Sequence, residues 1–173
     1  MDTQAFEKFL EQYERDIFTF CKYLTMDTDL ASELYQETAL AAFQMIDKIN
    51  PDNNPKSFML AIAAGKWKNM RRKSIRRQAI APEVSIDKLT NTQGNISIEK
   101  ELITAEMAQC INNILANMKD KFKLPLILHY FDEMSMDEIG KILAIPPGTV
   151  KSRLFKGRAL LKKSLEKEGF YHE

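Results

Sequence analysis

The chain has 173 residues, enough for one domain or two small ones, and its hydrophobic fraction of 45% is sufficient for a buried core. It contains no signal peptide and no long apolar span, so we expect a cytoplasmic protein without membrane insertion. The formal net charge of +1 hides an uneven distribution, because residues 1–37 are acidic whereas residues 66–77 and 151–163 contain no acidic residue. This asymmetry favours one surface for nucleic acid and another for a different partner.

Two helices are predicted in the acidic N-terminal part of the chain. Apolar side chains recur at steps of three and four residues from Phe6 to Leu24, which predicts the first helix. The second is predicted over Leu30–Phe43, with the segment from Asp27 to Asp29 as a candidate N-cap. The residues expected on its inner face are Leu34, Ala41 and Met45. The polar residues outside that face, which are either solvated surface or a docking site, are Glu33, Gln36 and Glu37.

A loop and a third helix follow. Turn-forming residues predict the loop over Asn50–Pro55, and the helix is predicted from Phe58 to about Ile75 with Ser57 as its N-cap. Its end is strongly basic and free of acids, which favours contact with a nucleic-acid backbone over a solvated face, since each neutralised phosphate releases counterions. The cations assigned to this contact are Lys66, Lys68, Arg71, Arg72, Arg76 and Arg77. We expect Trp67, which lies among them, to belong to the core rather than to stack on bases.

The helical periodicity fails after Gln78. Pro82 and scattered polar residues predict a linker there, with at most a short turn around Ile86–Leu89. The predicted parts of the chain are therefore a first domain over residues 1–78, a linker over residues 79–100 and a second domain over residues 101–173.

The second domain is predicted to begin with two helices. Apolar residues from Ile103 to Met118 mark the first, which should be about five turns long. The second is predicted near Leu124–Phe131, with Pro125 in its first turn, where a proline removes no helical hydrogen bond; a helix that starts at Asp120 would have to tolerate this proline. His129 is a lone histidine in this helix, so we expect it to pack or lie on the surface rather than to act in catalysis.

Residues 135–163 predict a helix, a tight turn and a second helix. Ser135 and Glu138 form a capping box, the two prolines and the glycine of Ile145–Gly148 cannot continue a helix, and Thr149 is a suitable cap for the next one. The apolar stripe of the second helix comprises Val150, Leu154, Leu161 and Leu165, with Gly157 in the same stripe. A residue without a side chain at that place lets two helix backbones approach closely.

The second helix of this motif carries an unusual set of exposed residue types in its first turns. They are Lys151, Ser152, Arg153, Phe155, Lys156 and Arg158. A recognition helix reads base edges from its N-terminal turns and holds phosphates with basic side chains. The alternative is an amphipathic helix with a solvated basic face. The capping box, the turn and the basic first turns together favour DNA binding.

At this point the chain resembles the extracytoplasmic-function (ECF) sigma factors of bacterial RNA polymerase. Ala31–Thr38 resembles the helix with which that family binds the polymerase clamp, and Ile139–Leu154 resembles its motif for reading the minus-thirty-five element. Leu124–Phe131 resembles the helix that precedes this motif. The resemblance covers nearly the whole chain in the right order.

The resemblance implies an all-α protein of two helical domains joined by a flexible linker, the second domain with a helix-turn-helix. Its implied partners are core RNA polymerase, promoter DNA and an anti-sigma factor. The residues implied to face the polymerase clamp are Glu33, Gln36 and Glu37. Asn53 and Asn54 lie in the loop implied to recognise the minus-ten element, whereas Lys151, Ser152, Phe155 and Lys156 match positions that reach minus-thirty-five DNA. Gly65 departs from the family, which commonly has Asn there.

Two other classes of function remain as alternatives. A helix-turn-helix regulator with an N-terminal sensing or dimerisation domain would not need the second basic helix, and a protein-interaction module would not protect specific DNA. An enzyme is not expected, because the sequence has no glycine-rich phosphate loop, no metal-ligand spacing and no nucleophile–base arrangement. Cys21 and Cys110 are far apart in apolar stripes, so we expect them to be buried, with no disulfide, metal or cofactor.

Overall fold

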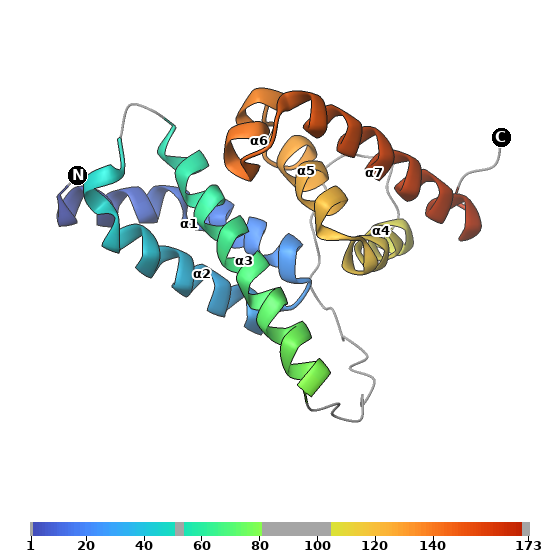
Figure 1. Cartoon of the computed structure of the whole chain (residues 1–173), viewed down its shortest axis with the longest axis horizontal. Coiled ribbons are helices and arrows are strands. Elements are labelled where there is room, and N and C mark those ends of the chain that lie inside the picture. Colours follow the sequence, from blue (N-terminus) through green and yellow to red (C-terminus); the bar gives the residue numbers. More distant parts are fainter. Residues whose placement is uncertain (1, 51–53, 81–104, 171–173) are drawn as a thin grey trace. The chain divides into compact units, whose positions relative to one another are not determined.

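The computed structural model of the chain describes residues 2–50, 54–80 and 105–170. Within these ranges the ordered elements are seven α-helices and one short 3-10 helix, without a strand, which confirms the predicted all-α class (Figure 1). The chain divides into two compact units, Met1–Gln93 and Gly94–Glu173. The expected turn at Ile86–Leu89 and nearly all of the predicted linker lie outside the described residues.

The N-terminal unit is built from three helices, α1 (Thr3–Thr25), α2 (Thr28–Gln44) and α3 (Pro55–Ile80), each of which packs against the other two. A 3-10 helix (Ile46–Lys48) follows α2. The predicted cap of α2 is confirmed at Asp27, whose carboxylate accepts a hydrogen bond of 2.9 Å from the Leu30 N–H. This bond satisfies one of the free donors at the helix start.

The core of this unit lies where the three helices meet. Its largest fully buried side chains are Ile17, Phe20, Leu24, Leu34, Met59 and Leu60. Trp67 is only 5% exposed, so its predicted place in the core is confirmed. The inner face of α2 differs from the prediction, because Thr38 and Ala42 are buried while Ala41 and Met45 are half-buried. Because α2 packs against both α1 and α3, its buried stripe lies at a different angle around the helix from the one predicted. The hydroxyl of buried Thr38 donates a 2.7 Å hydrogen bond to the Leu34 carbonyl and is thereby satisfied.

Helix α3 is longer than predicted at both ends. It begins at Pro55, so Ser57 is not its cap but a residue of the first turn, and the Asn54 side chain accepts a 3.2 Å hydrogen bond from the Ser57 N–H instead. Proline suits the first helical position because its missing N–H would have no partner there. The last turns up to Ile80 are fully exposed and extend beyond the core, with Pro82 as the next residue that disfavours a helix.

The C-terminal unit comprises α4 (Ala105–Asn117), α5 (Asp120–Tyr130), α6 (Met136–Leu143) and α7 (Pro147–Lys167), and α7 packs against the other three. Pro125 does not lie in the first turn of its helix, because α5 takes the alternative start at Asp120, five residues earlier, and tolerates the proline. Every residue from Lys123 to Leu128 is buried. Burial of this stretch therefore outweighs the hydrogen bond that the proline removes.

The predicted helix, turn and helix are present as α6 and α7. The capping box is confirmed: the Ser135 hydroxyl accepts from the Glu138 N–H at 3.3 Å, and the Glu138 carboxylate accepts from the Ser135 N–H at 2.9 Å. Helix α7 begins at Pro147 rather than after Thr149, which lies in its first turn and does not cap it. The fixed φ of proline is already helical, so the helix can start there.

The turn between α6 and α7 is tight. A Cβ atom on Gly140 would lie 2.8 Å from the Ile145 carbonyl oxygen, which is closer than real Cβ atoms come. A Cβ atom on Gly157 would lie 3.0 Å from Leu126 of α5, which confirms the close approach of two helices predicted at this glycine. Both glycines therefore permit contacts that hold the helix-turn-helix together.

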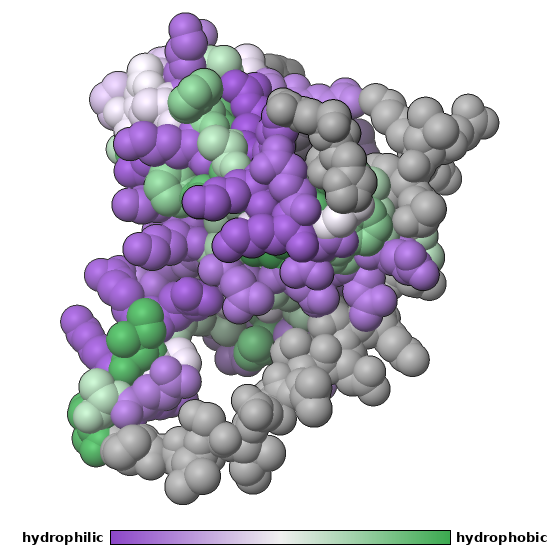
Figure 2. All heavy atoms as spheres, turned by 90° about the vertical axis from the view of Figure 1, so that its right-hand side faces the viewer, coloured by the Kyte–Doolittle hydropathy of each residue, from purple (hydrophilic) through white to green (hydrophobic). Residues whose placement is uncertain are grey.

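The described surface is mainly polar. None of the helices in the described ranges is long and apolar enough to cross a membrane. On the face drawn in Figure 2, hydrophilic side chains cover most of the described residues, and hydrophobic atoms show only in small separate areas.

Two glycine substitutions test the turn geometry. Gly140→Ala should lower the free energy of unfolding by about 1–2 kcal/mol, because the overlap with a backbone oxygen outweighs the better helix propensity of alanine. Gly65→Ala is the matched control: no atom lies within 4 Å of the added Cβ, so it should raise stability by roughly 0.5–1 kcal/mol. Chemical denaturation followed by circular dichroism measures both, and a neutral Gly140→Ala would contradict the tight turn.

Candidate nucleic-acid and protein interfaces

The structure brings most of the predicted DNA-binding residues of α7 to its exposed side. Those exposed are Lys151, Ser152, Phe155, Lys156 and Arg158, whereas Arg153 is half-buried. Phe155 is 67% exposed although it is aromatic, while Val150, Leu154 and Gly157 are buried. The apolar stripe thus anchors the helix, and Phe155 is left available to a partner.

The polar residues of this face keep functional atoms available. The Ser152 hydroxyl donates a 3.0 Å hydrogen bond to the Thr149 carbonyl one turn earlier, so its oxygen can still accept from a base. Lys151, Phe155 and Arg158 follow one another at steps of four and three residues and therefore lie along one line of the helix.

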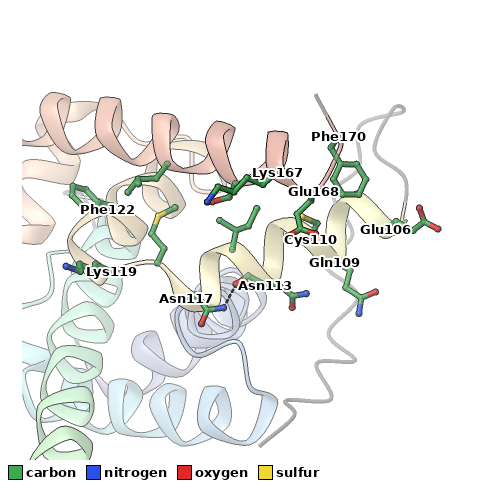
Figure 3. Close-up of a pocket in the computed structure, with 14 residues that line it drawn as sticks. Glu106, Gln109, Cys110, Asn113, Asn117, Lys119, Phe122, Lys167, Glu168 and Phe170 are labelled. Carbon is green, nitrogen blue, oxygen red and sulfur yellow. Dashed lines mark hydrogen bonds between the residues drawn. The ribbon is translucent and has the colours of Figure 1, made fainter. Parts of the chain in front are cut away.

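A groove in the C-terminal unit was not predicted from the sequence. It has a volume of about 900 Å³ and is bordered by α4 and the end of α7 (Figure 3). Apolar residues of its lining are Ile114, Met118, Phe122 and Leu160, and charged residues are Glu106, Lys119, Lys167 and Glu168. The groove is lined by residues of α4, the start of α5 and the end of α7, which are distant in the sequence, so no local sequence pattern predicts it.

Neither cysteine offers a reactive thiolate. Cys21 is buried as expected, and burial raises the pKa of its thiol to about 12. Cys110 lines the groove and is half-buried rather than fully buried, and its pKa is raised by burial and then by the carboxylate of Glu168. A thiol with a raised pKa stays protonated at neutral pH and is a weak nucleophile. Within the described residues there is no group of three or more side chains that could hold a metal ion.

The basic end of α3 is exposed as predicted, with one exception. Of the cations predicted to contact DNA, those exposed are Lys68, Arg71, Arg72, Arg76 and Arg77, and Lys73 between them is exposed as well. The guanidinium of Arg71 lies 5.6 Å from the ring centroid of Trp67, and Arg72 donates to the side chain of Asn69. Lys66 differs because it points towards α2. Asn54 is exposed at the start of α3, whereas Asn53 lies outside the described residues.

The three polar residues predicted for α2, namely Glu33, Gln36 and Glu37, are all exposed on its outer face. Leu30 and Leu40 lie on the same side of the helix and are 40% and 55% exposed. These two leucines were not predicted as part of the face, although their helical spacing places them outside the buried stripe and so indicates that they are exposed. This face therefore offers a partner protein both apolar contact area and polar groups.

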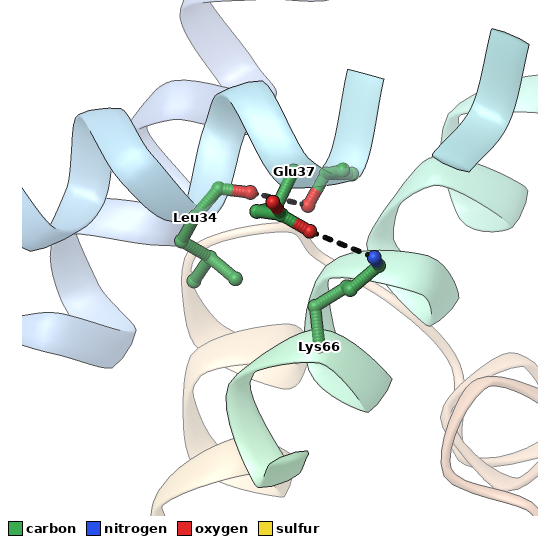
Figure 4. Close-up of polar contacts among 4 residues, drawn as sticks. Leu34, Glu37 and Lys66 are labelled. Atoms are coloured by element: carbon green, nitrogen blue, oxygen red, sulfur yellow. Dashed lines mark hydrogen bonds and ion pairs between the residues drawn. The ribbon is translucent and has the colours of Figure 1, made fainter. Parts of the chain in front are cut away.

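Glu37 is held by an ion pair across two helices. The ammonium of Lys66 lies 2.9 Å from its carboxylate (Figure 4). The hydrogen bond and the charge of Lys66, with a smaller effect of Lys73, lower the pKa of Glu37. Lys66 is therefore engaged with the outer face of α2 and does not lie free beside the other cations of α3.

The fold and the exposed faces define a helical protein of two units that carries a helix-turn-helix. Comparison with known families gives two matches: Sigma-70 region 2 over residues 9–77, and Sigma-70, region 4 over residues 108–161. Together they cover well over half of the chain. The chain belongs to the sigma-70 family and is an ECF RNA polymerase sigma factor, a transcription initiation factor. This finding favours the first of the three functions considered from the sequence.

Curated relatives and solved structures agree with this assignment. The chain is 27% identical to the ECF sigma factor SigW of Bacillus subtilis, over 95% of this chain and 90% of that protein. It is 23% identical to SigM of the same organism, over 90% and 92%. Its fold is similar to the sigma factor RpoE in complex with the anti-sigma factor NepR from Bartonella quintana, with a TM-score of 0.77, 21% identity and coverage of 95% and 98%. CnrH in complex with the cytosolic domain of CnrY gives a TM-score of 0.68, with 16% identity and coverage of 96% and 90%.

The ion pair predicts a measurable titration. The pKa of Glu37 in the folded protein is lowered below its ordinary value of 4.5. The ion pair therefore stabilises the fold at pH values above the pKa of the unfolded state, and this stabilisation is lost as the pH falls through the pKa of the folded state. Lys66→Met should therefore raise the pKa of Glu37 towards 4.5. NMR titration of the carboxyl carbon measures the change, with Lys56→Met, which removes an ion pair to Asp16, as the control. An unshifted Glu37 in the Lys66 variant would show that the pair is absent in solution.

Proposed function

We propose that this sigma factor uses three separate surfaces to bind polymerase and promoter DNA. The outer face of α2 docks core RNA polymerase, the basic end of α3 with the preceding loop contacts the minus-ten region, and the first turns of α7 read the minus-thirty-five element. The protein catalyses no step of its own and acts in the cytoplasm together with polymerase. We propose no cofactor for it.

The observation that carries the proposal is the division of α7 into a buried and an exposed side. Val150 and Leu154 are buried, and Phe155 between the exposed cations is not. A helix held in this way can enter a major groove without losing its own packing. Short side chains and an aromatic ring in its first turns can contact base edges, while long cations reach phosphates.

The exposed cations of α3 suit a different task. Lys68, Arg71, Arg72, Arg76 and Arg77 extend over three turns without an acidic residue. Such a row neutralises backbone phosphates largely independently of base sequence. We assign base recognition in the minus-ten region to the loop that includes Asn53 and Asn54, as the family resemblance implies. Because Lys66 pairs with Glu37, we assign it to the support of α2 rather than to DNA.

The polymerase-binding surface is proposed to comprise Glu33, Gln36 and Glu37, flanked by Leu30 and Leu40. A docking face needs apolar contact area as well as polar anchors, and these leucines supply it. We also propose an anti-sigma factor as a partner, because the sigma factor RpoE from Bartonella quintana, which has a similar fold, was solved in complex with the anti-sigma factor NepR.

The experiment that tests the function is reconstitution. Purified protein is added to core polymerase, and transcription starts are mapped across genomic DNA. A common pair of elements upstream of the new starts supports the proposal. Starts that are the same as those of core polymerase alone would contradict it.

A double variant tests the proposed polymerase-binding face of α2. Gln36→Ala combined with Glu37→Ala should leave the fold nearly unchanged, because both side chains are exposed, and should weaken core polymerase binding at least about tenfold through the loss of polar anchors. Glu7→Ala with Glu11→Ala, which alters exposed acids of α1, is the control. Affinity is measured by fluorescence anisotropy on the full-length protein. If the two double variants bind alike, α2 is not the docking helix.

Two single variants test the proposed DNA-reading face of α7. Ser152→Ala and Phe155→Ala should each change which minus-thirty-five sequences are preferred, by about 1–3 kcal/mol per affected base pair, because they remove base-edge contacts. Lys163→Ala, at the far end of the same helix, should leave the preference unchanged. The measurement is transcription by holoenzyme from a library with randomised minus-thirty-five positions. Wild-type preference at every position in both variants would place the reading surface elsewhere.

A further inference from the structure

An unassigned side chain of α5 lies beside the reading face of α7. Arg158 donates a hydrogen bond from Nη1 to the hydroxyl of Tyr130 at 3.3 Å, across 28 positions of the chain. Tyr130 is the last residue of α5 and is 52% exposed. Arg158 is also exposed and continues the line of Lys151 and Phe155 along α7. The two side chains therefore extend the exposed face of α7 onto a second helix.

The ring of Tyr130 is held in place by the connection between α5 and α6. It packs edge-on against His129, with ring centroids 4.9 Å apart and an angle of 76°. The Nδ1 atom of His129 lies 3.1 Å from the carbonyl oxygen of Met134. A carbonyl can only accept, so Nδ1 donates, and this bond ties the histidine ring to a buried residue. The ring of Tyr130 thus packs against a histidine that is itself hydrogen-bonded to the backbone, which restricts the positions of its hydroxyl.

The chemistry of the pair suits an anion with several oxygens. Because the Tyr130 hydroxyl accepts from Arg158, its own proton remains available to a further acceptor. Arg158 keeps other N–H groups, and it forms no ion pair within the described part of the chain. Two neighbouring donors, one of them cationic, then face solvent together. A guanidinium beside a hydroxyl matches the geometry of a phosphate better than that of a base edge.

We propose that Tyr130 and Arg158 form a clamp for one backbone phosphate of the minus-thirty-five DNA. Tyr130 donates directly to the phosphate and also positions the guanidinium of Arg158. Both α5 and α7 therefore contribute a contact to the DNA. The clamp rests on the proposed function of α7. It adds affinity and register, and it carries no base preference of its own.

The test uses reconstituted holoenzyme and promoter DNA, with binding measured by fluorescence anisotropy over a series of salt concentrations. Tyr130→Phe should weaken binding about fivefold to tenfold, because it removes one hydrogen bond to a charged group and keeps the ring. The salt dependence should stay as in the wild type, since no charge is lost. Arg158→Gln should weaken binding at least as much and lower the log–log salt slope by roughly one unit.

The combination of the two substitutions separates a clamp from two independent effects. In the Arg158→Gln protein, Tyr130→Phe should weaken binding by a clearly smaller factor than in the wild type, because the guanidinium that it positions is already gone and only its own hydrogen bond to the phosphate remains to be lost. Tyr13→Phe, which removes a hydroxyl in the N-terminal unit, is the control and should bind as the wild type does. The midpoint of thermal unfolding and the minus-thirty-five preference should be the same in all four variants.

A promoter series with one uncharged methylphosphonate at a time identifies the phosphate. One linkage should abolish the effect of both substitutions. Wild-type affinity of Tyr130→Phe, or full additivity of the two changes, would overturn the clamp while leaving the proposed function intact. If wild-type holoenzyme showed no dependence on the minus-thirty-five element, the proposed function itself would fail.

Discussion

The C-terminal unit depends on the close approach of α7 to α5. Gly157 makes it possible, since a Cβ atom there would already touch Leu126 at 3.0 Å. Burial of Val150 and Leu154 on the same stripe then fixes the rotation of α7 about its own axis. Once that rotation is fixed, Lys151, Phe155 and Arg158 have to face outwards. The recognition surface is therefore a consequence of the packing on the other side of the helix.

The N-terminal unit obeys a similar constraint. Helix α2 contacts both α1 and α3, and Ala31, Leu34, Thr38 and Ala42 are the residues it buries. Small side chains at two of these positions allow α2 to lie close to its neighbours, which leaves the opposite face for a partner. The ion pair between Lys66 and Glu37 ties this face to α3, the helix whose far end carries the cations proposed to contact DNA. The docking surface and the basic surface are thus parts of one packed unit.

Two prolines show how local and tertiary effects compete. Pro147 starts α7 because its ring fixes a helical φ and its missing N–H has no partner at that position. Pro125 lies inside α5, where local rules alone disfavour it, and is tolerated because the residues around it are buried. Proline was thus a dependable signal in the exposed turn and a poor one in the core. The full length of α3 could have been predicted, since no proline stands between Pro55, which suits a helix start, and Pro82.

The sequence by itself determined the all-α class, the helix-turn-helix with its capping box, and the sets of residues proposed for DNA and polymerase. The helical class, the motif and the basic residues proposed for DNA follow from helical periodicity, capping and clustered charge, which are local and can be recognised within a few turns. The residues proposed for polymerase are implied by the family resemblance. Only the tertiary structure decided that Lys66 pairs with Glu37, that Arg158 meets Tyr130, and that α4 and α7 border a groove. Each of these joins residues far apart in the chain. Their contact depends on how helices pack, and packing is set by the shapes of many side chains together rather than by any short pattern.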